Sequence, residues 1–193
     1  RSACDGKNDV QAGCHYFSRG ADGTKVNDYI WDNNLHNSPD LSAALTEAFD
    51  HLYSGMDTAF TPGVTTTEAN SMGVDKPRIK YEGGSSVVAR GWTQKKDENF
   101  VKFINEMHFD PRMGDLTLKN LRKYEAMGVK TLISFRNAGD EGIHGQWGHK
   151  QFIWQTGDCY KWNGMVEWIN NPPTWHTITV SAGAGGSITI AEG

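Results

Sequence analysis

Hydrophobic residues recur at three- and four-residue spacing in several stretches of the chain, the pattern of helices with one buried face. The clearest stretch follows Ser38 and Pro39, which suit the cap and the first position of a helix, and it ends at Gly55. The same spacing predicts helices over 97–107 and 118–127, and a shorter helix over 163–169. The apolar positions of the first helix are Leu41, Ala44, Leu45, Ala48, Phe49 and Leu52.

Short runs rich in β-branched and aromatic residues predict the strands. Residues 78–81 and 86–92 flank Gly83-Gly84 and predict a hairpin, and residues 129–135 predict a strand directly after a helix. Residues 1–37, rich in Gly, Asn and Asp, predict loop with short extended pieces. We therefore expect an α+β fold, a single compact domain with about three to four helices and a mostly antiparallel sheet.

Composition agrees with one globular domain over residues 1–175, since 37% of the 193 residues are hydrophobic and 22% are charged. The net charge is −4, and no run of Lys or Arg is longer than Lys95-Lys96, so a nucleic-acid partner is not expected. No apolar stretch approaches the roughly 18 residues of a membrane span. No phosphate loop or compact zinc motif occurs, so we expect no cofactor and no metal.

The three cysteines bear on the cellular location. Cys4 and Cys14 flank a polar, Gly-containing loop that can bring two sulfur atoms together, which predicts a disulfide; the alternative is two free thiols. Because small loop-closing disulfides are typical of exported proteins, we expect a secreted or cell-surface location. Cys159 is left without a partner near it in sequence, and is buried and inert, paired with another chain, or reactive.

Five of the seven tryptophans lie between Trp147 and Trp175. Such a group forms either a dense core layer or a ligand platform. Gly, Gln, Asn and Asp are interleaved with these tryptophans, which suits the hydroxyl groups of a carbohydrate better than a core. The residues that we expect to bind a glycan are Trp147, His149, Trp154 and Trp162.

Two short motifs, Gly142-Ile143-His144-Gly145 and Thr156-Gly157-Asp158-Cys159-Tyr160-Lys161, resemble the active-site pattern of the L,D-transpeptidases. The resemblance implies that the Cys159 thiolate attacks a peptidoglycan amide and that His144 takes the thiol proton. It also implies that Lys161 stands where that family has an arginine. The reaction would be acyl transfer or hydrolysis.

Two other segments also resemble extracellular proteins. The run from Gly148 to Trp154 is similar to the Gly-His-x-x-Gln-x-x-Trp signature of the cysteine-rich secretory (CAP) superfamily, one residue short. The segment from His176 to Ile190 is similar to the opening of repeat modules in bacterial surface proteins. Residues 176–193 are accordingly either a closing β-hairpin of the domain or the start of a following repeat module in a larger surface protein.

Together these signals predict an extracellular domain that acts on a cell wall, with a glycan or peptidoglycan polymer as its partner. In one form it is a hydrolase or transferase that uses Cys159, His144 and Lys161. In the alternative form it is a non-catalytic carbohydrate-binding or adhesion module that uses the Trp-rich segment.

Overall fold

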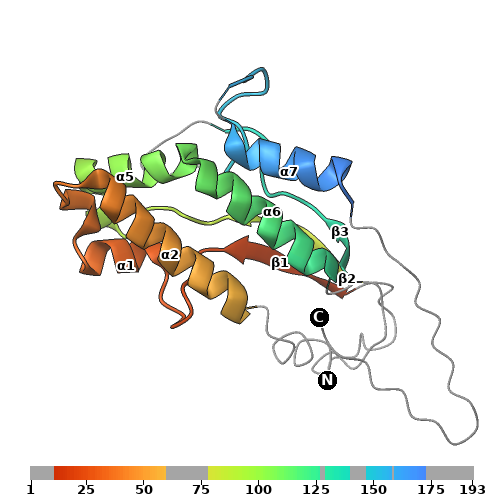
Figure 1. The fold of residues 1–193 in the computed structure, drawn as a ribbon, viewed down its shortest axis with the longest axis horizontal. Helices are drawn as coiled ribbons and strands as arrows, with labels where there is room; N and C mark the ends of the chain where they lie inside the picture. Colours follow the sequence, from red (N-terminus) through yellow and green to blue (C-terminus); the bar gives the residue numbers. More distant parts are fainter. Residues whose placement is uncertain (1–10, 60–77, 127–128, 140–146, 158, 173–193) are drawn as a thin grey trace, which may run out of the picture.

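The computed structural model describes residues 11–59, 78–126, 129–139, 147–157 and 159–172. Most of these residues are helical, and helices stand between successive strands (Figure 1). The elements in chain order are β1 (Gln11–Phe17), α1 (Val26–Asp32), the 3-10 helix η1 (Leu35–Asn37), α2 (Leu41–Ala59), β2 (Arg78–Ser85), α4 (Trp92–Lys96), α5 (Glu98–Phe109), α6 (Pro111–Ala126), β3 (Val129–Leu132) and α7 (Tyr160–Asn170).

The strands form one sheet in the order β1-β2-β3, and both strand pairs are parallel. Backbone pairing continues past β3, because the amides of Ile133 and Phe135 donate to the carbonyls of Lys80 and Gly83 at 2.9 and 3.0 Å. Two parallel strands start at the same end of the sheet, so the chain must return to that end between them. A helical connection allows this return, and a tight hairpin does not. The predicted α+β fold with about three to four helices and a mostly antiparallel sheet is therefore wrong, because the described residues contain six α-helices and a small parallel sheet.

The pair Gly83-Gly84 lies inside β2 and is not the turn of a hairpin. β2 stays paired with β1 through Ser85, opposite Phe17. Gly84 has a φ of +125°, which glycine adopts without the steric cost that a side chain adds. Residues 86–91 then leave the sheet and lead into α4, so the strand predicted over 86–92 is wrong.

Helix α2 buries Ala44, Ala48, Phe49 and Leu52 as the spacing predicts, whereas Leu41 is 41% exposed, and the helix differs from the prediction at both ends. Asp40, two residues after Ser38, caps the helix by accepting a hydrogen bond at 3.0 Å from the amide of Ala43. The helix continues through Gly55 to Ala59. A side chain at Gly55 would overlap the carbonyl of Arg19, so glycine serves close packing here and does not end the helix.

Helices α5, α6 and α7 overlap their predicted ranges, and α6 and α7 begin earlier than the apolar spacing indicated. Asp97 caps α5 by accepting a hydrogen bond from the amide of Phe100 at 2.8 Å. Helix α4 was not predicted, and residues 1–37, expected to be loop with short extended pieces, also contain the helices α1 and η1. The hairpin or module predicted at 176–193 lies outside the described residues.

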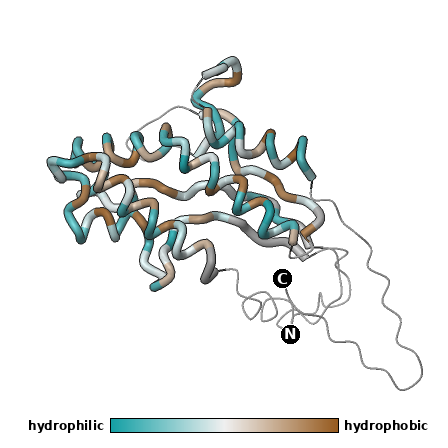
Figure 2. The backbone as a smooth tube through the Cα atoms, viewed as in Figure 1, coloured by the Kyte–Doolittle hydropathy of each residue, from teal (hydrophilic) through white to brown (hydrophobic). Residues whose placement is uncertain are grey.

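The apolar faces of α1, α2, α5 and α6 enclose a shared core. Hydrophobic and hydrophilic stretches alternate along these helices, as expected where one face is buried (Figure 2). The largest fully buried side chains are Phe49, Phe100, Phe103, Ile30, Leu52, Ile104, Met107, Met113, Leu116, Val26 and Val87.

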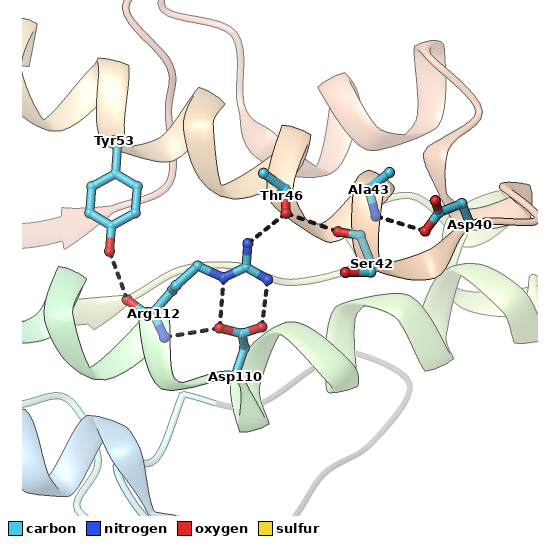
Figure 3. A network of polar contacts seen from close by, with 7 residues as sticks. All are labelled: Asp40, Ser42, Ala43, Thr46, Tyr53, Asp110 and Arg112. Atoms are coloured by element: carbon cyan, nitrogen blue, oxygen red, sulfur yellow. Dashed lines mark hydrogen bonds and ion pairs between the residues drawn. The ribbon is translucent and has the colours of Figure 1, made fainter.

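Arg112 joins α2 to the junction of α5 and α6 (Figure 3). Its guanidinium donates two hydrogen bonds to the Asp110 carboxylate at 2.8 and 2.6 Å and a third to the Thr46 hydroxyl at 3.0 Å. It also lies 4.4 Å from the centre of the Phe49 ring. Burial raises the pKa of Asp110, but its hydrogen bonds from Arg112 outweigh burial and hold that pKa below its usual value.

Helices α6 and α7 lie side by side and touch through glycines (Figure 1). A side chain at Gly114 would lie 2.6 Å from the carbonyl oxygen of Tyr160, and one at Gly164 would overlap the carbonyl of Gly114. The Trp168 indole also donates to Glu125 at 3.0 Å. This contact fixes the rotation of α7 against α6. No helix in the described ranges combines the length and apolar character needed to cross a bilayer.

Candidate functional site

The carboxyl ends of the three parallel strands lie at one edge of the sheet, where ligand sites are common in parallel sheets. Ser134 follows β3 at this edge, and its Oγ lies 2.8 Å from Nε2 of His149. His149 is buried, with 4% of its surface exposed, and Ser134 is partly buried. A serine hydroxyl hydrogen-bonded to an imidazole nitrogen is the arrangement of a nucleophile with its base.

Backbone contacts between two loop segments fix the position of His149. Its amide donates to the carbonyl of Asn137 at 3.1 Å, and Ala138 and Lys150 form an isolated parallel bridge. Gly148 has no room for a side chain, since a Cβ there would lie 2.7 Å from the amide nitrogen of Gly139. The imidazole is therefore held by ordered backbone on both sides.

The end of β2 lies against the same imidazole. A Cβ built on Gly84 would lie 4.0 Å from Cε1 and Nε2 of His149, which places the ring directly beside this strand. The next residue, Ser85, is 2% exposed, and its hydroxyl has no hydrogen-bond partner among the described residues. A buried hydroxyl without an acceptor costs free energy, so the burial of Ser85 is a local cost to stability at the end of β2.

Helix α7 adds a buried cation to this region. Met165 places its sulfur 3.8 Å from Ser134 Oγ, and Lys161 precedes Met165 by one helical turn on the same face. Lys161 is 2% exposed, and its Nζ lies 3.3 Å from Nδ1 of His108. Nε2 of His108 lies 2.8 Å from the carbonyl oxygen of Val87.

The two contacts of His108 determine which of its ring nitrogens carries the proton. A carbonyl oxygen only accepts, so Nε2 of His108 donates to Val87 and Nδ1 accepts from the Lys161 amine. Burial lowers the pKa of Lys161 from 10.5 to about 7. Burial, and then repulsion from Lys161, lowers the pKa of His108 well below its usual value. The pair is thus neutral on the alkaline side of pH 7.

The residues of the predicted cysteine site occupy different surroundings. Cys159 is 7% exposed, and its sulfur lies 3.8 Å from Oδ1 of Asn163 in the first turn of α7. Lys161 directs its amine at buried His108. His144 lies outside the described residues, so its pairing with Cys159 stays a prediction.

The predicted disulfide also stays a prediction. Cys4 lies outside the described residues, and Cys14 belongs to β1, with only its backbone described. No group of three His, Cys, Asp or Glu side chains gathers to hold a metal ion within the described part of the chain.

Trp147 belongs to an aromatic row beside Ser134. Its ring makes an edge contact with Phe135 at 6.3 Å, and Phe135 makes another with Tyr16 at 6.2 Å. Phe135 is half exposed, whereas Tyr16 and Trp147 are partly buried. Two of the predicted ligand residues, Trp147 and His149, therefore lie at the strand ends.

Trp154 lies elsewhere, on the aromatic loop of residues 150–157, which projects beyond α7 at the top of Figure 1. Trp154 is 78% exposed, and Phe152 lies beside it with the ring centres 5.3 Å apart. Ile153 between them is 79% exposed. The loop therefore presents three large apolar side chains to solvent.

Trp162 supports the base of this loop. The Lys150 amine lies 4.5 Å from the centre of the Trp162 ring and donates to the carbonyl of Gln155 at 3.0 Å. The Gln155 side chain in turn accepts from the Gln151 amide at 2.7 Å. The four predicted ligand residues thus divide between the strand ends and the aromatic loop.

The sequence did not identify Ser134 or His108 as site residues. The one available signal for Ser134 was its place in the strand predicted over 129–135, whose end is exposed to a ligand in a parallel sheet. Nothing in the sequence linked Ser134 to His149 or His108 to Lys161. No family model matches the chain, and comparisons with curated proteins and with solved structures find no significant match.

Proposed function

We propose that this protein is an extracellular carbohydrate-binding domain that holds a glycan polymer on the aromatic loop. The observation that carries the proposal is the exposure of Trp154, at 78% of its surface, beside Phe152. Soluble proteins rarely leave adjacent large apolar side chains in water unless the surface has a binding role.

The internal bonding of the loop supports a binding role for these side chains. The carbonyl of Phe152 accepts from the amide of Gln155 at 3.1 Å, which closes a turn at the tip. The Gln151–Gln155 and Lys150–Gln155 contacts hold both sides of this turn. Because these contacts restrain the loop, little conformational entropy is lost when a ligand binds.

The shape of the aromatic pair favours a sugar chain as the ligand. The two rings are tilted by 39° to each other, so they offer two faces in different directions. The C–H faces of sugar rings pack on aromatic faces, and the exposed polar residue Thr156 stands close in sequence for hydroxyl contacts. Peptidoglycan and other cell-wall glycans are the polymers that fit a secreted or cell-surface protein.

The acyl-transfer form of this function, with Cys159 as nucleophile, is less well supported. Cys159 is 7% exposed, and a thiol must meet its substrate to react. The binding form needs no reaction at Cys159. It is therefore the form that we propose.

The test is sedimentation of the protein with insoluble polysaccharides: peptidoglycan, chitin and cellulose. We expect the wild-type protein to bind at least one of them and Trp154→Ala to bind at least about tenfold more weakly, since a buried aromatic contact contributes on the order of 1.5 kcal/mol. Trp92→Ala is the matched control, because Trp92 is 69% exposed on α4. Equal binding by wild type and Trp154→Ala, or no binding to any polymer, would contradict the proposal.

A further inference from the structure

We propose that Ser134 and His149 form a catalytic dyad that hydrolyses carboxylic esters at the carboxyl edge of the sheet. The inference rests on the contact between Ser134 Oγ and His149 Nε2, at 2.8 Å. It does not depend on glycan binding by the aromatic loop. Neither the Cys159 site nor the carbohydrate site includes Ser134.

The dyad stands where a parallel sheet presents groups to a ligand. Ser134 lies two residues past the end of β3, and Gly84 near the end of β2 lies against the His149 ring. Sites in open parallel sheets form outside the carboxyl ends of the strands, because residues from neighbouring strands converge there.

The hydrogen-bonding partners of Ser134 favour transfer of its proton to His149. Among the described residues, the acceptors within reach of the hydroxyl are His149 Nε2 and the Met165 sulfur, the latter at 3.8 Å. A thioether is a weak acceptor, whereas a neutral imidazole nitrogen is a strong one. In the tautomer with the ring proton on Nδ1, Nε2 accepts the hydroxyl proton and is placed to act as a general base.

The aromatic row defines the kind of ester. Phe135, next to Ser134, is half exposed, and its ring makes an edge contact with Trp147. These rings offer an apolar surface for the alcohol portion of a substrate. Because the rings carry no charge, the substrate needs no carboxylate to bind them. The substrate class is therefore an uncharged ester whose alcohol portion is apolar or has an apolar face.

The reaction balances with water as the only co-reactant. Ser134 Oγ attacks the ester carbonyl carbon while its proton passes to His149 Nε2, and the bond from that carbon to the alcohol oxygen breaks. The leaving alkoxide takes the proton from Nε2, and the acyl group remains on Ser134. Water then gives a proton to Nε2 and attacks the acyl carbon. The bond from that carbon to Ser134 Oγ breaks, Oγ takes the proton back from Nε2, and the carboxylic acid leaves.

The experiment treats the whole chain with diisopropyl fluorophosphate and maps the adduct by peptide mass spectrometry. The serine oxygen bonds to phosphorus as fluoride leaves, so an activated serine is marked without any substitution. We expect one adduct per chain, on Ser134, and none on Ser42, an exposed serine of α2. No adduct, or an adduct on other serines only, would overturn the dyad.

Hydrolysis of p-nitrophenyl acetate gives an independent measurement. We expect the rate to fall about 100-fold or more in Ser134→Ala and in His149→Gln, and to stay unchanged in Ser42→Ala. Circular dichroism of each variant shows whether the fold is kept. If Ser134→Ala folds and hydrolyses the ester as fast as wild type, the proposal is wrong, whatever the outcome of the polysaccharide experiment.

Discussion

The helical core and the strand ends of this molecule are built from opposite kinds of buried residue. In the helical core, the largest side chains without solvent exposure are apolar, as Phe49, Phe100 and Ile104 illustrate. At the strand ends, His149 and Lys161 are almost as deeply buried, at 4% and 2% exposed. Burial of apolar groups stabilises the fold, whereas burial of polar groups costs free energy unless each one is paired.

The buried apolar residues of the helical core stabilise the fold, whereas the burial of polar residues at the strand ends needs another explanation. A fold of this size requires a core like that of α1, α2, α5 and α6, but it does not require a buried lysine against a histidine. Local conflicts with stability are expected at functional sites. The strand ends are therefore the part of the molecule where chemistry is most reasonably sought.

The largest effect that we predict is the loss of stability when a buried ring is removed from the helical core. Phe100 is fully buried and makes edge contacts with Trp31 and His36 at 5.5 and 5.4 Å. Phe100→Ala removes a buried ring and leaves a cavity, so we expect the free energy of unfolding to fall by about 3–5 kcal/mol. Urea denaturation followed by circular dichroism measures the loss.

Phe152→Ala is the control for this substitution. Phe152 is 38% exposed on the aromatic loop, and its loss should change the free energy of unfolding by less than about 0.5 kcal/mol. Similar losses in the two variants would show that the helical core is not the main source of stability.

The sequence predicted helices α2 and α5 of the core because apolar residues three and four apart indicate a buried face directly. It did not predict α1, whose Val26 and Ile30 belong to the same core. Gly55 misled the prediction because glycine marks both helix ends and close contacts. Only the packing of α2 against Arg19 distinguishes the two roles.

The strand ends were harder to predict because their contacts join residues distant in sequence. Gly83-Gly84 has the local composition of a turn, and only pairing with β1 and β3 shows that it lies within a strand. Ser134 and His149 are separated by a segment with no regular period, and His108 is 53 residues from Lys161. Lysine is usually exposed, so no feature of the sequence indicated a buried lysine at position 161.

The second prediction concerns the buried Lys161. Its pKa is about 7 in the folded protein and near 10.5 when exposed, so between these values the unfolded chain binds the extra proton. The free energy of unfolding should therefore rise with pH above about 7, by at most about 1.4 kcal/mol per pH unit. Urea denaturation at pH 7, 8 and 9 measures this slope.

Lys161→Met should remove most of the slope, since methionine cannot bind a proton. Lys102→Met, at an exposed position of α5, should leave the slope unchanged. The range stops at pH 9 because burial raises the pKa values of Tyr29 and Tyr53, whose ionisation in the unfolded chain opposes the trend above about pH 10. If the slope persists in Lys161→Met, a group other than Lys161 causes the pH dependence of the free energy of unfolding.

The smallest predicted effect tests whether a partly exposed polar contact in the helical region is as costly to lose as a buried ring of its apolar core. Asp97 caps α5, but its side chain is 32% exposed, so water can replace part of its hydrogen bond to the amide of Phe100. Asp97→Ala should lower the free energy of unfolding by about 1 kcal/mol, while Asp97→Asn, which keeps a capping oxygen, should lower it by less. Thermal denaturation of both variants near neutral pH measures the difference. A loss in Asp97→Ala as large as that in Phe100→Ala would mean that a partly exposed polar contact matters as much as the apolar core, and the contrast between the two regions would not hold.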